Sequence, residues 1–413
     1  MTLIKTSILS AIAQIIRIVS GFVVTKVIAV YIGPSGLAVI GQLQNFINIV
    51  LIFAGDLFKT ATTKYTAEYL DDSHKKYNLW STTIKLILLL NIFIFCVLFF
   101  FSTEIVTFLL GNEKYSYILK ILAFSIPFFV FNTFLLSILN GHRQIQKYIL
   151  LSILLSLVSL FLVVLLSVSH GLKGALIAYT TNQSVVFFIT IYVIRKETWF
   201  KFKNFTQKFN SIELKKLFGF ALITLFAILA SNLNLMVIRD FISTNISLES
   251  AGYWQGIWTL SGVSLSLITM SLTTYFLPTL SSLKNKNDIS KELKKALILI
   301  IPIASFISLC MYLFRDFIIY ILYTDEFLPM AELFLWQMIG NTIKVVGWLY
   351  GYTLVAKAMV KYTVGTEIVF ALSFIFLSML LVTQFGLIGV TYAFTINSVL
   401  HAVTVYTIYK YKV

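Results

Sequence analysis

Charged residues and cysteines are both scarce in this sequence. Only 12% of the 413 residues are charged, whereas 59% are hydrophobic and the mean hydropathy is +0.91. Soluble domains are roughly 45–50% apolar and about 25% charged, so the composition excludes an ordinary soluble enzyme. Cys96 and Cys310 lie inside apolar runs, which excludes a disulfide framework or a cysteine metal cluster. The first apolar stretch lacks a small-residue cleavage site, and we expect it to be a retained span.

The apolar residues fall into about twelve runs that are separated by charge clusters and by Gly or Pro residues. A helix needs about 20 apolar residues to cross the hydrocarbon core. The predicted spans are 6–32, 37–61, 79–103, 115–140, 146–169, 172–195, 214–239, 250–280, 294–314, 328–355, 360–382 and 386–409. They leave no room for a large soluble domain. The expected fold is an all-α polytopic membrane protein.

Basic residues are distributed unequally between the connections. If the N-terminus lies inside, 23 of the 32 Lys and Arg residues fall in inner connections or at the termini. Four fall in outer connections, namely Lys114, Lys173, Arg239 and Arg315. The positive-inside rule therefore predicts that both termini are cytoplasmic. The net charge of +15 is explained by topology, and no nucleic-acid partner is expected.

The two halves of the sequence contain a repeat. The segments GLKGALIAYTTN at 171–182 and GLIGVTYAFTIN at 386–397 are identical at six of twelve places, and EIVTFLLGNE at 104–113 weakly matches DFIIYILYTD at 316–325. The offset spans six helices, so the halves are expected to be parallel. We predict an N-terminal six-helix bundle over 1–195, a cytoplasmic basic linker over 196–213 and a C-terminal six-helix bundle over 214–413. Two such bundles around a central cavity are typical of alternating-access transporters, and a channel or scaffold is the alternative.

Polar side chains within the predicted spans form stripes, although such groups are costly at membrane depth. The first span carries Gln14 and Arg17, and the second carries Gln42, Asn45 and Asp56 on one face. On the tenth span, one face holds Gln337, Asn341, Lys344, Trp348 and Tyr352 at spacings of four, three, four and four. Arg17 and Lys344 are expected near mid-membrane.

These stripes indicate a cationic centre that attracts an anion, because the guanidinium group of Arg suits phosphate oxygens. Amide and aromatic residues, among them Gln255, Trp254 and Trp258, suit the hydroxyls and the apolar faces of a sugar. We therefore expect Arg17, Lys344 and the amide and aromatic residues of the stripes to bind substrate. No cofactor and no metal are expected.

Three charged residues have two interpretations each. Lys26 either snorkels to the interface or contacts substrate. Asp56 either pairs with Lys59, three residues away, or serves as a protonation or ion-coupling site. Glu367 either forms a salt bridge with Lys361 or acts as a second ion-coupling carboxylate.

Nine short motifs span essentially the whole chain. They are GPSGL at 33–37, TKY at 63–65, WQG at 254–256, LPTLS at 277–281, RDF at 315–317, WQ at 336–337, KV at 344–345, GY at 351–352 and AKA at 356–358. Taken together, and in this order along the chain, these motifs resemble the lipid III flippases of enterobacterial common antigen synthesis. They also resemble the related Wzx-type O-antigen translocases, which are polysaccharide transporters of the multidrug/oligosaccharidyl-lipid/polysaccharide exporter superfamily.

The resemblance implies a twelve-helix protein of the bacterial inner membrane that flips an undecaprenyl-diphosphate-linked oligosaccharide to the periplasmic leaflet. It implies membrane lipid, a glycan polymerase and a chain-length regulator as partners. The residues carried over by the motifs and by the resemblance are Lys26, Lys64, Arg239, Arg315, Asp316, Gln337 and Lys344. Asp56 has no matching motif, and its role rests on the residue pattern alone.

Other functions remain as alternatives. One is a proton- or cation-coupled exporter of another lipid-linked precursor or of a small molecule, although a cationic centre disfavours cationic drugs. Another is a membrane-embedded glycan polymerase or ligase. The longest predicted outer connection is roughly 15 residues and carries no catalytic cluster, which disfavours an enzyme.

Overall fold

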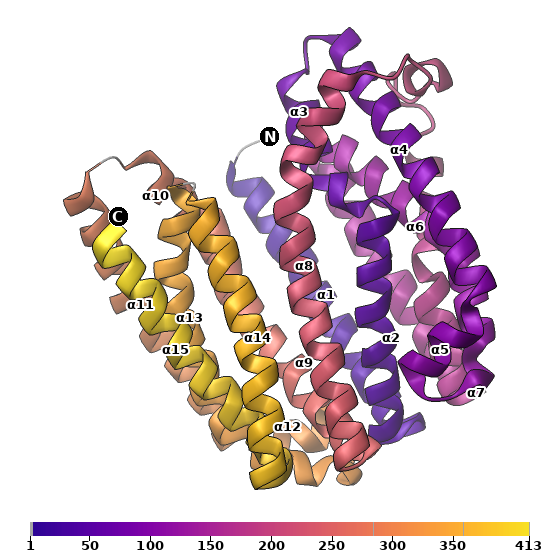
Figure 1. The fold of residues 1–413 in the computed structure, drawn as a ribbon. Helices are drawn as coiled ribbons and strands as arrows, with labels where there is room; N and C mark the ends of the chain where they lie inside the picture. The colour runs from indigo at the N-terminus through magenta and orange to yellow at the C-terminus, as the bar shows by residue number, and fades with distance from the viewer. Residues whose placement is uncertain (1–2, 284, 358, 413) are drawn as a thin grey trace. The chain divides into compact units, whose positions relative to one another are not determined.

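The computed structural model describes residues 3–283, 285–357 and 359–412. Lys284, which was counted among the inner basic residues, and Ala358 of the AKA motif lie outside the described residues. Within these ranges the chain is helical, with no strand (Figure 1). Seven of the described segments are long and apolar enough to cross a membrane, and two of them, Ile145–Ile194 and Val360–Lys412, each contain a pair of helices. The predicted all-α polytopic membrane fold is confirmed.

The first compact unit comprises Met1–Ile32 and Gln42–Asn232. Its helices are α1 (Leu3–Tyr31), α2 (Gly33–Ala54), η1 (Asp56–Phe58), α3 (Lys59–Glu68), α4 (Ser73–Phe100), α5 (Ser102–Leu110), η2 (Glu113–Tyr115), α6 (Ser116–Gly141), α7 (Ile145–Ile194), η3 (Phe202–Phe205) and α8 (Ser211–Asn245). The N-terminal part of α2 and the C-terminal part of α8 belong to the second unit. Within unit 1, α7 packs against both α1 and α6.

The second compact unit comprises Gly33–Gly41 and Leu233–Val413. Its further helices are α9 (Leu248–Ser271), the π-helix η4 (Leu272–Phe276), α10 (Leu277–Ser282), α11 (Lys286–Leu313), α12 (Arg315–Leu322), η5 (Asp325–Leu333), α13 (Phe334–Ala356), α14 (Val360–Phe385), η6 (Gly386–Ile388) and α15 (Gly389–Lys412). Helix α13 packs against α15 and α11 (Figure 1). It therefore lies in the interior of this unit and positions the polar face described below.

The predicted repeat has the same local backbone in both units. Gly171 interrupts α7 with φ 54° and ψ −137°, and Gly386 ends α14 with φ 68° and ψ −152°. Three residues later, a Cβ on Gly174 would lie 1.8 Å from the Leu166 carbonyl oxygen. On Gly389 it would lie 2.1 Å from the carbonyl oxygen of Leu381, also eight residues earlier. The GLxG motif thus forms the same tight turn between two helices twice.

The weaker repeat also corresponds in structure. Phe101 caps the C-terminus of α4 with φ −102° and ψ 23°, and Phe314 caps that of α11 with φ −97° and ψ 16°. A short helix, α5 or α12, follows each of these residues. The described chain therefore repeats one order of elements, in which the second and third helices of each half are each followed by a short helix.

Several predicted helix boundaries were wrong. The span 37–61 is broken at Gly55, where φ is 130°, and the span 328–355 begins only at Phe334 because 325–333 forms a 3₁₀ helix. Helix α8 runs to Asn245, beyond the predicted end at 239. Arg239 consequently lies within α8 and is 3% exposed, not in an outer connection. Hydropathy alone locates apolar runs but not the backbone angles at which a helix breaks.

The segment 196–213, which was predicted as a linker, packs onto unit 1. Trp199 and Asn204 are 4% and 3% exposed, and the Trp199 ring lies 5.7 Å from the Trp80 ring on α4. The Gln207 backbone N–H donates a hydrogen bond of 2.9 Å to Ser81 Oγ. The compact units separate within α8 after Asn232, so this segment is part of the first unit.

Candidate functional site

Two cationic side chains and two tryptophans form a row inside unit 2. Arg239 on α8 lies 5.8 Å from the Trp254 ring centre and donates a hydrogen bond to Gln255 Oε1. The rings of Trp254 and Trp258, which are one turn apart on α9, lie 5.7 Å apart. Lys344 Nζ on α13 lies 5.7 Å from the Trp258 ring centre. The order of the row is therefore Arg239, Trp254, Trp258 and Lys344.

Lys344 is surrounded by aromatic rings. In addition to Trp258, its Nζ lies 5.6 Å from the Trp348 ring centre and 5.1 Å from that of Phe394. Glu367 on α14 acts on it electrostatically, but in the described part of the chain Lys344 has no hydrogen bond and no ion pair within 4.0 Å. Each cation–π contact contributes about 0.5–2 kcal/mol. The rings thus stabilise the ammonium group and leave its N–H donors for a ligand.

Buried amides lie next to this row. Gln337 is 0% exposed, and neither its Oε1 nor its Nε2 has a hydrogen-bond partner among the described residues. Asn341 donates to Ser261 Oγ at 3.2 Å, but its Oδ1 has no partner there, and neither has Trp254 Nε1. Each such buried group costs about 1–3 kcal/mol. Buried polar atoms of this kind occur in both units of the described chain, and those of Gln337, Asn341 and Trp254 lie on α13 and α9, the two helices that also carry Lys344 and Trp258.

The predicted face of α13 lies on one uninterrupted helix. Gln337 and Asn341 are buried, whereas Lys344, Trp348 and Tyr352 are half-buried further along. Glu367 is exposed and forms no ion pair within 4.0 Å, with Lys361 or another group, in the described chain. The Glu367 carboxylate instead interacts electrostatically with the Lys344 ammonium group.

The predicted polar residues of the first two spans belong to unit 1. Arg17 on α1 is exposed and donates a hydrogen bond to Gln14 Oε1. Lys26 is half-buried on the same helix. Gln42 and Asn45 on α2 are each 8% exposed. These residues belong to unit 1, whereas the row around Lys344 belongs to unit 2.

Asp56 does not continue the polar face of α2. The helix breaks at Gly55, and Asp56 begins the short helix η1, so a helical projection through Gln42 and Asn45 fails beyond residue 54. Asp56 and the exposed Lys59 form no ion pair within 4.0 Å in the described structure. The ion pair with Lys59, which was one of the two interpretations of Asp56, is therefore not formed, although Lys59 still acts on Asp56 electrostatically.

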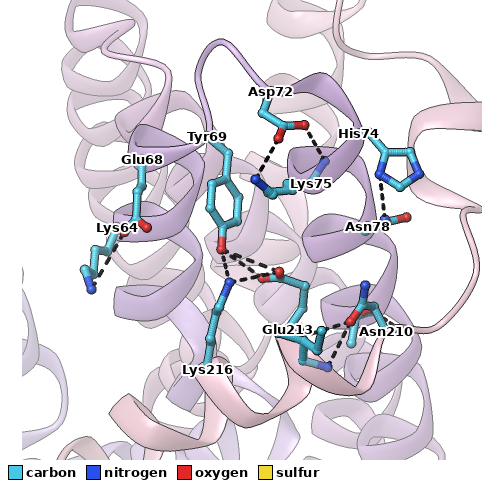
Figure 2. A network of polar contacts seen from close by, with 12 residues as sticks. Lys64, Glu68, Tyr69, Asp72, His74, Lys75, Asn78, Asn210, Glu213 and Lys216 are labelled. Carbon is cyan, nitrogen blue, oxygen red and sulfur yellow. Dashed lines mark hydrogen bonds and ion pairs between the residues drawn. The ribbon is translucent and has the colours of Figure 1, made fainter.

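A polar network joins the end of α3 to the start of α8 (Figure 2). Tyr69 Oη donates to the carboxylate of the buried Glu213 at 3.4 Å and accepts a hydrogen bond from Lys216 Nζ. Lys216 also forms an ion pair of 3.1 Å with Glu213. Asn210 Oδ1 accepts from the Ile212 backbone N–H at 2.9 Å, which caps α8. Tyr69 is 144 residues from Glu213 in the sequence, and helical periodicity gave no signal for its contacts with Glu213 and Lys216.

A second group of contacts fixes the segment after α7. Glu197 accepts hydrogen bonds from Lys147 Nζ and from Gln144 Nε2. The hydrogen bond and the charge of Lys147 hold the pKa of Glu197 below its ordinary value. His142 stacks on Trp199 with a centroid distance of 5.6 Å, and burial lowers the pKa of His142 to about 4. This end of unit 1 is therefore rigidly held by polar and aromatic contacts.

The row in unit 2 combines three chemical capacities. Guanidinium and ammonium groups attract a phosphate, tryptophan rings stack on apolar sugar faces, and unpaired amides bind hydroxyls. Among the described residues there is no cluster of three His, Cys, Asp or Glu side chains arranged to hold a metal. The arrangement suits recognition of an anionic, sugar-bearing ligand.

Known proteins resemble this chain over nearly its full length. The Lipid III flippase of Escherichia coli (strain K12) is 27% identical over 368 residues, which cover 89% of this chain and 88% of that protein. An inward-facing multidrug resistance MATE family transporter of the MOP superfamily superposes with a TM-score of 0.80 at 16% identity, covering 96% of this chain and 97% of the other. The lipid II flippase MurJ, in an inward closed conformation, superposes with a TM-score of 0.74 at 17% identity, covering 98% and 87%.

The chain also matches a protein family directly. The family Polysacc_synt, described as polysaccharide biosynthesis protein, matches residues 3–284. The match covers the first unit from Leu3 onward, the row residues Arg239, Trp254 and Trp258, and more than half of the chain. The protein therefore belongs to the Polysacc_synt family of polysaccharide biosynthesis proteins.

Proposed function

We propose that this protein is a flippase that carries an undecaprenyl-diphosphate-linked oligosaccharide from the cytoplasmic to the periplasmic leaflet of the bacterial inner membrane. The row of Arg239, Trp254, Trp258 and Lys344 is the observation that carries the proposal. Family membership and the likeness to a Lipid III flippase over 89% of the chain support it. The carried glycan is either lipid III of enterobacterial common antigen or an O-antigen unit.

Each kind of side chain in and beside the row binds a different part of the head group. Lys344, at one end of the row, pairs with the diphosphate, and the indole rings of Trp254 and Trp258 stack on sugars. Arg239, at the other end of the row, contacts the glycan. Gln337 and Asn341 supply amides whose unpaired atoms bind hydroxyls. An unpaired buried polar atom costs about 1–3 kcal/mol. Substrate hydroxyls that hydrogen-bond to these atoms would remove this cost and thereby favour binding. Arg17, Gln14, Gln42 and Asn45 contribute a second polar surface from unit 1.

We propose a membrane topology in which both termini are cytoplasmic, because 23 basic residues lie in the inner connections and at the termini. The predicted halves 1–195 and 214–413 operate by alternating access, and the segment 196–213, which packs onto unit 1, leads from the first half into the second. A glycan polymerase and a chain-length regulator are the expected partners on the product side. Transport is favoured over enzymatic chemistry because the relatives are named as flippases and transporters.

The proposal is tested with purified protein in liposomes that contain a labelled polyprenyl-diphosphate oligosaccharide. An impermeant enzyme reports how much head group reaches the opposite leaflet. We expect the protein to accelerate transfer over empty liposomes, and Lys344→Met to slow it at least tenfold, since one charge–phosphate hydrogen bond contributes about 1.5–3 kcal/mol.

Lys120→Met is the matched control, because Lys120 also lies over an aromatic ring, that of Phe99 at 5.9 Å, but is exposed. It should flip at the wild-type rate. Full activity of Lys344→Met would overturn the assigned role of the row. Lack of acceleration by the wild type with several glycans would refute the flippase proposal and favour an exporter of another lipid-linked precursor.

A further inference from the structure

The segment 196–213 is fixed to unit 1 through the side that faces α4. The Phe205 ring stacks on the Trp80 ring of α4 with a centroid distance of 5.6 Å. Lys85, also on α4, donates a hydrogen bond of 2.7 Å from its Nζ to the Gln207 carbonyl oxygen. These contacts hold the segment along its length, so the side chains that it exposes form a defined surface.

The exposed side chains of this stretch are basic or apolar, apart from Thr and Ser residues, and none is acidic between positions 195 and 215. Phe202 is 86% exposed and stands between the exposed Lys201 and Lys203. Phe209 and Ile212 are 47% and 65% exposed. The six exposed basic residues are Arg195, Lys196, Lys201, Lys203, Lys208 and Lys215.

The two carboxylates of the stretch are neutralised within unit 1. Glu197 forms an ion pair with Lys147, and Glu213 forms one with Lys216. None of the six exposed basic residues forms an ion pair within 4.0 Å in the described chain. Their positive charges are therefore available to an external anion.

The stretch begins where a membrane-crossing helix ends. Helix α7 is long and apolar enough to cross a membrane and ends at Ile194, and α8, which contains the predicted span 214–239, begins at Ser211. At the end of α7, the Arg195 guanidinium lies 3.8 Å from the ring centre of the exposed Tyr192. Tyrosine rings and basic groups at helix ends are typical of the headgroup layer. The segment therefore starts at the depth of the lipid headgroups.

We infer that the exposed surface of residues 195–215 binds anionic phospholipid headgroups. The lysine ammonium groups pair with lipid phosphates, while Phe202, Phe209 and Ile212 enter the boundary with the acyl chains. Basic segments with apolar side chains lie in the plane of the membrane interface in this way. An acidic protein would match the charge, but a phenyl ring exposed between two lysines fits a partner whose apolar layer lies directly beneath its phosphates. This surface lies outside the row around Lys344, and its lipid binding does not depend on the proposed function.

The test uses the full-length protein in liposomes, with Phe202→Trp as the reporter. The parent protein, with its six tryptophans, supplies the background signal. Lipids that are brominated on the acyl chain quench a tryptophan that reaches the acyl region. In mixtures of phosphatidylglycerol and phosphatidylcholine, we expect brominated phosphatidylglycerol to quench the added tryptophan at least fivefold more effectively than brominated phosphatidylcholine. One basic residue at an anionic surface already strengthens binding about fivefold.

The charge dependence is tested in the reporter protein with Lys201→Gln, Lys203→Gln, Lys208→Gln and Lys215→Gln combined. This variant should quench equally with both lipids, whereas arginine at the same four positions should keep the preference. Salt provides a second measurement on the unaltered reporter. The preference should fall at least threefold at 1 M NaCl, where the screening length is about 3 Å.

The matched control removes four exposed lysines of α11 in unit 2, through Lys286→Gln, Lys291→Gln, Lys294→Gln and Lys295→Gln. It loses the same charge and should keep the preference at position 202. The inference is overturned if the two lipids quench the reporter equally, if the glutamine variant of 201–215 keeps the preference, or if the α11 variant loses it.

The opposite accessibility would also refute lipid binding. If aqueous acrylamide quenches the added tryptophan and neither brominated lipid does, the surface faces water and is left to an acidic protein partner. If the glutamine variant does not reconstitute, the salt series decides. No lipid-linked oligosaccharide is present in the assay, so its result is independent of whether the protein flips oligosaccharides.

Discussion

The GLxG turns permit a quantitative prediction about Gly174. A Cβ at this position would lie 1.8 Å from the Leu166 carbonyl oxygen, which is 1.6 Å short of an ordinary contact at 3.4 Å. The obstacle is backbone, and it is fixed by the turn at Gly171, so no side-chain rotation relieves it. Overpacking of this kind costs about 1–3 kcal/mol and occasionally more. We therefore expect Gly174→Ala to reduce the free energy of unfolding by about 3 kcal/mol.

The assay is thermal unfolding of the purified protein in detergent, followed by circular dichroism. Gly389→Ala, whose Cβ would lie 2.1 Å from the Leu381 carbonyl oxygen, should lower the melting temperature similarly. Gly219→Ala is the control: this helical glycine has nothing within 4 Å of a Cβ, so alanine should stabilise by about 0.5–1 kcal/mol. The reasoning is refuted if Gly174→Ala melts at or above the temperature of Gly219→Ala.

Two further predictions concern pH. The pKa of His142 is lowered to about 4 from an ordinary value of about 6.5, so the unfolded chain binds the proton more tightly. Stability should fall as pH drops from about 6.5 toward 4, and His142→Asn should flatten this loss in pH-dependent melts, whereas the exposed His74→Asn should not. Glu197 has a lowered pKa, so its contribution is present above about 4.3 and lost as pH falls through the folded value. Glu197→Gln should cost about 1 kcal/mol at neutral pH, and a difference that does not begin to shrink as the pH falls below the ordinary glutamate pKa would contradict the assignment.

Predictions from the sequence succeeded where they depended on a single helix. The face from Gln337 to Tyr352 needs only the helical period, and it lies on one continuous helix, α13. Predictions from the sequence failed where the helix is interrupted. At Gly55 the helical geometry of α2 ends, so Asp56 does not lie on the same face as Gln42 and Asn45. Arg239 was assigned to a connection because a charge after an apolar run resembles a boundary. Its burial depends on Trp254 and Gln255 of another helix.

The sequence by itself determined the membrane location, the helical fold class and the repeat. These properties follow from the length of the apolar runs and from local backbone demands, such as those of Gly171 and Gly386. The tertiary structure decided which polar groups meet. Lys344 lies beside Trp258 and Phe394, and Tyr69 beside Glu213, because of the register in which separate helices pack. That register results from side-chain interlocking across helices, which the periodicity of one helix does not encode.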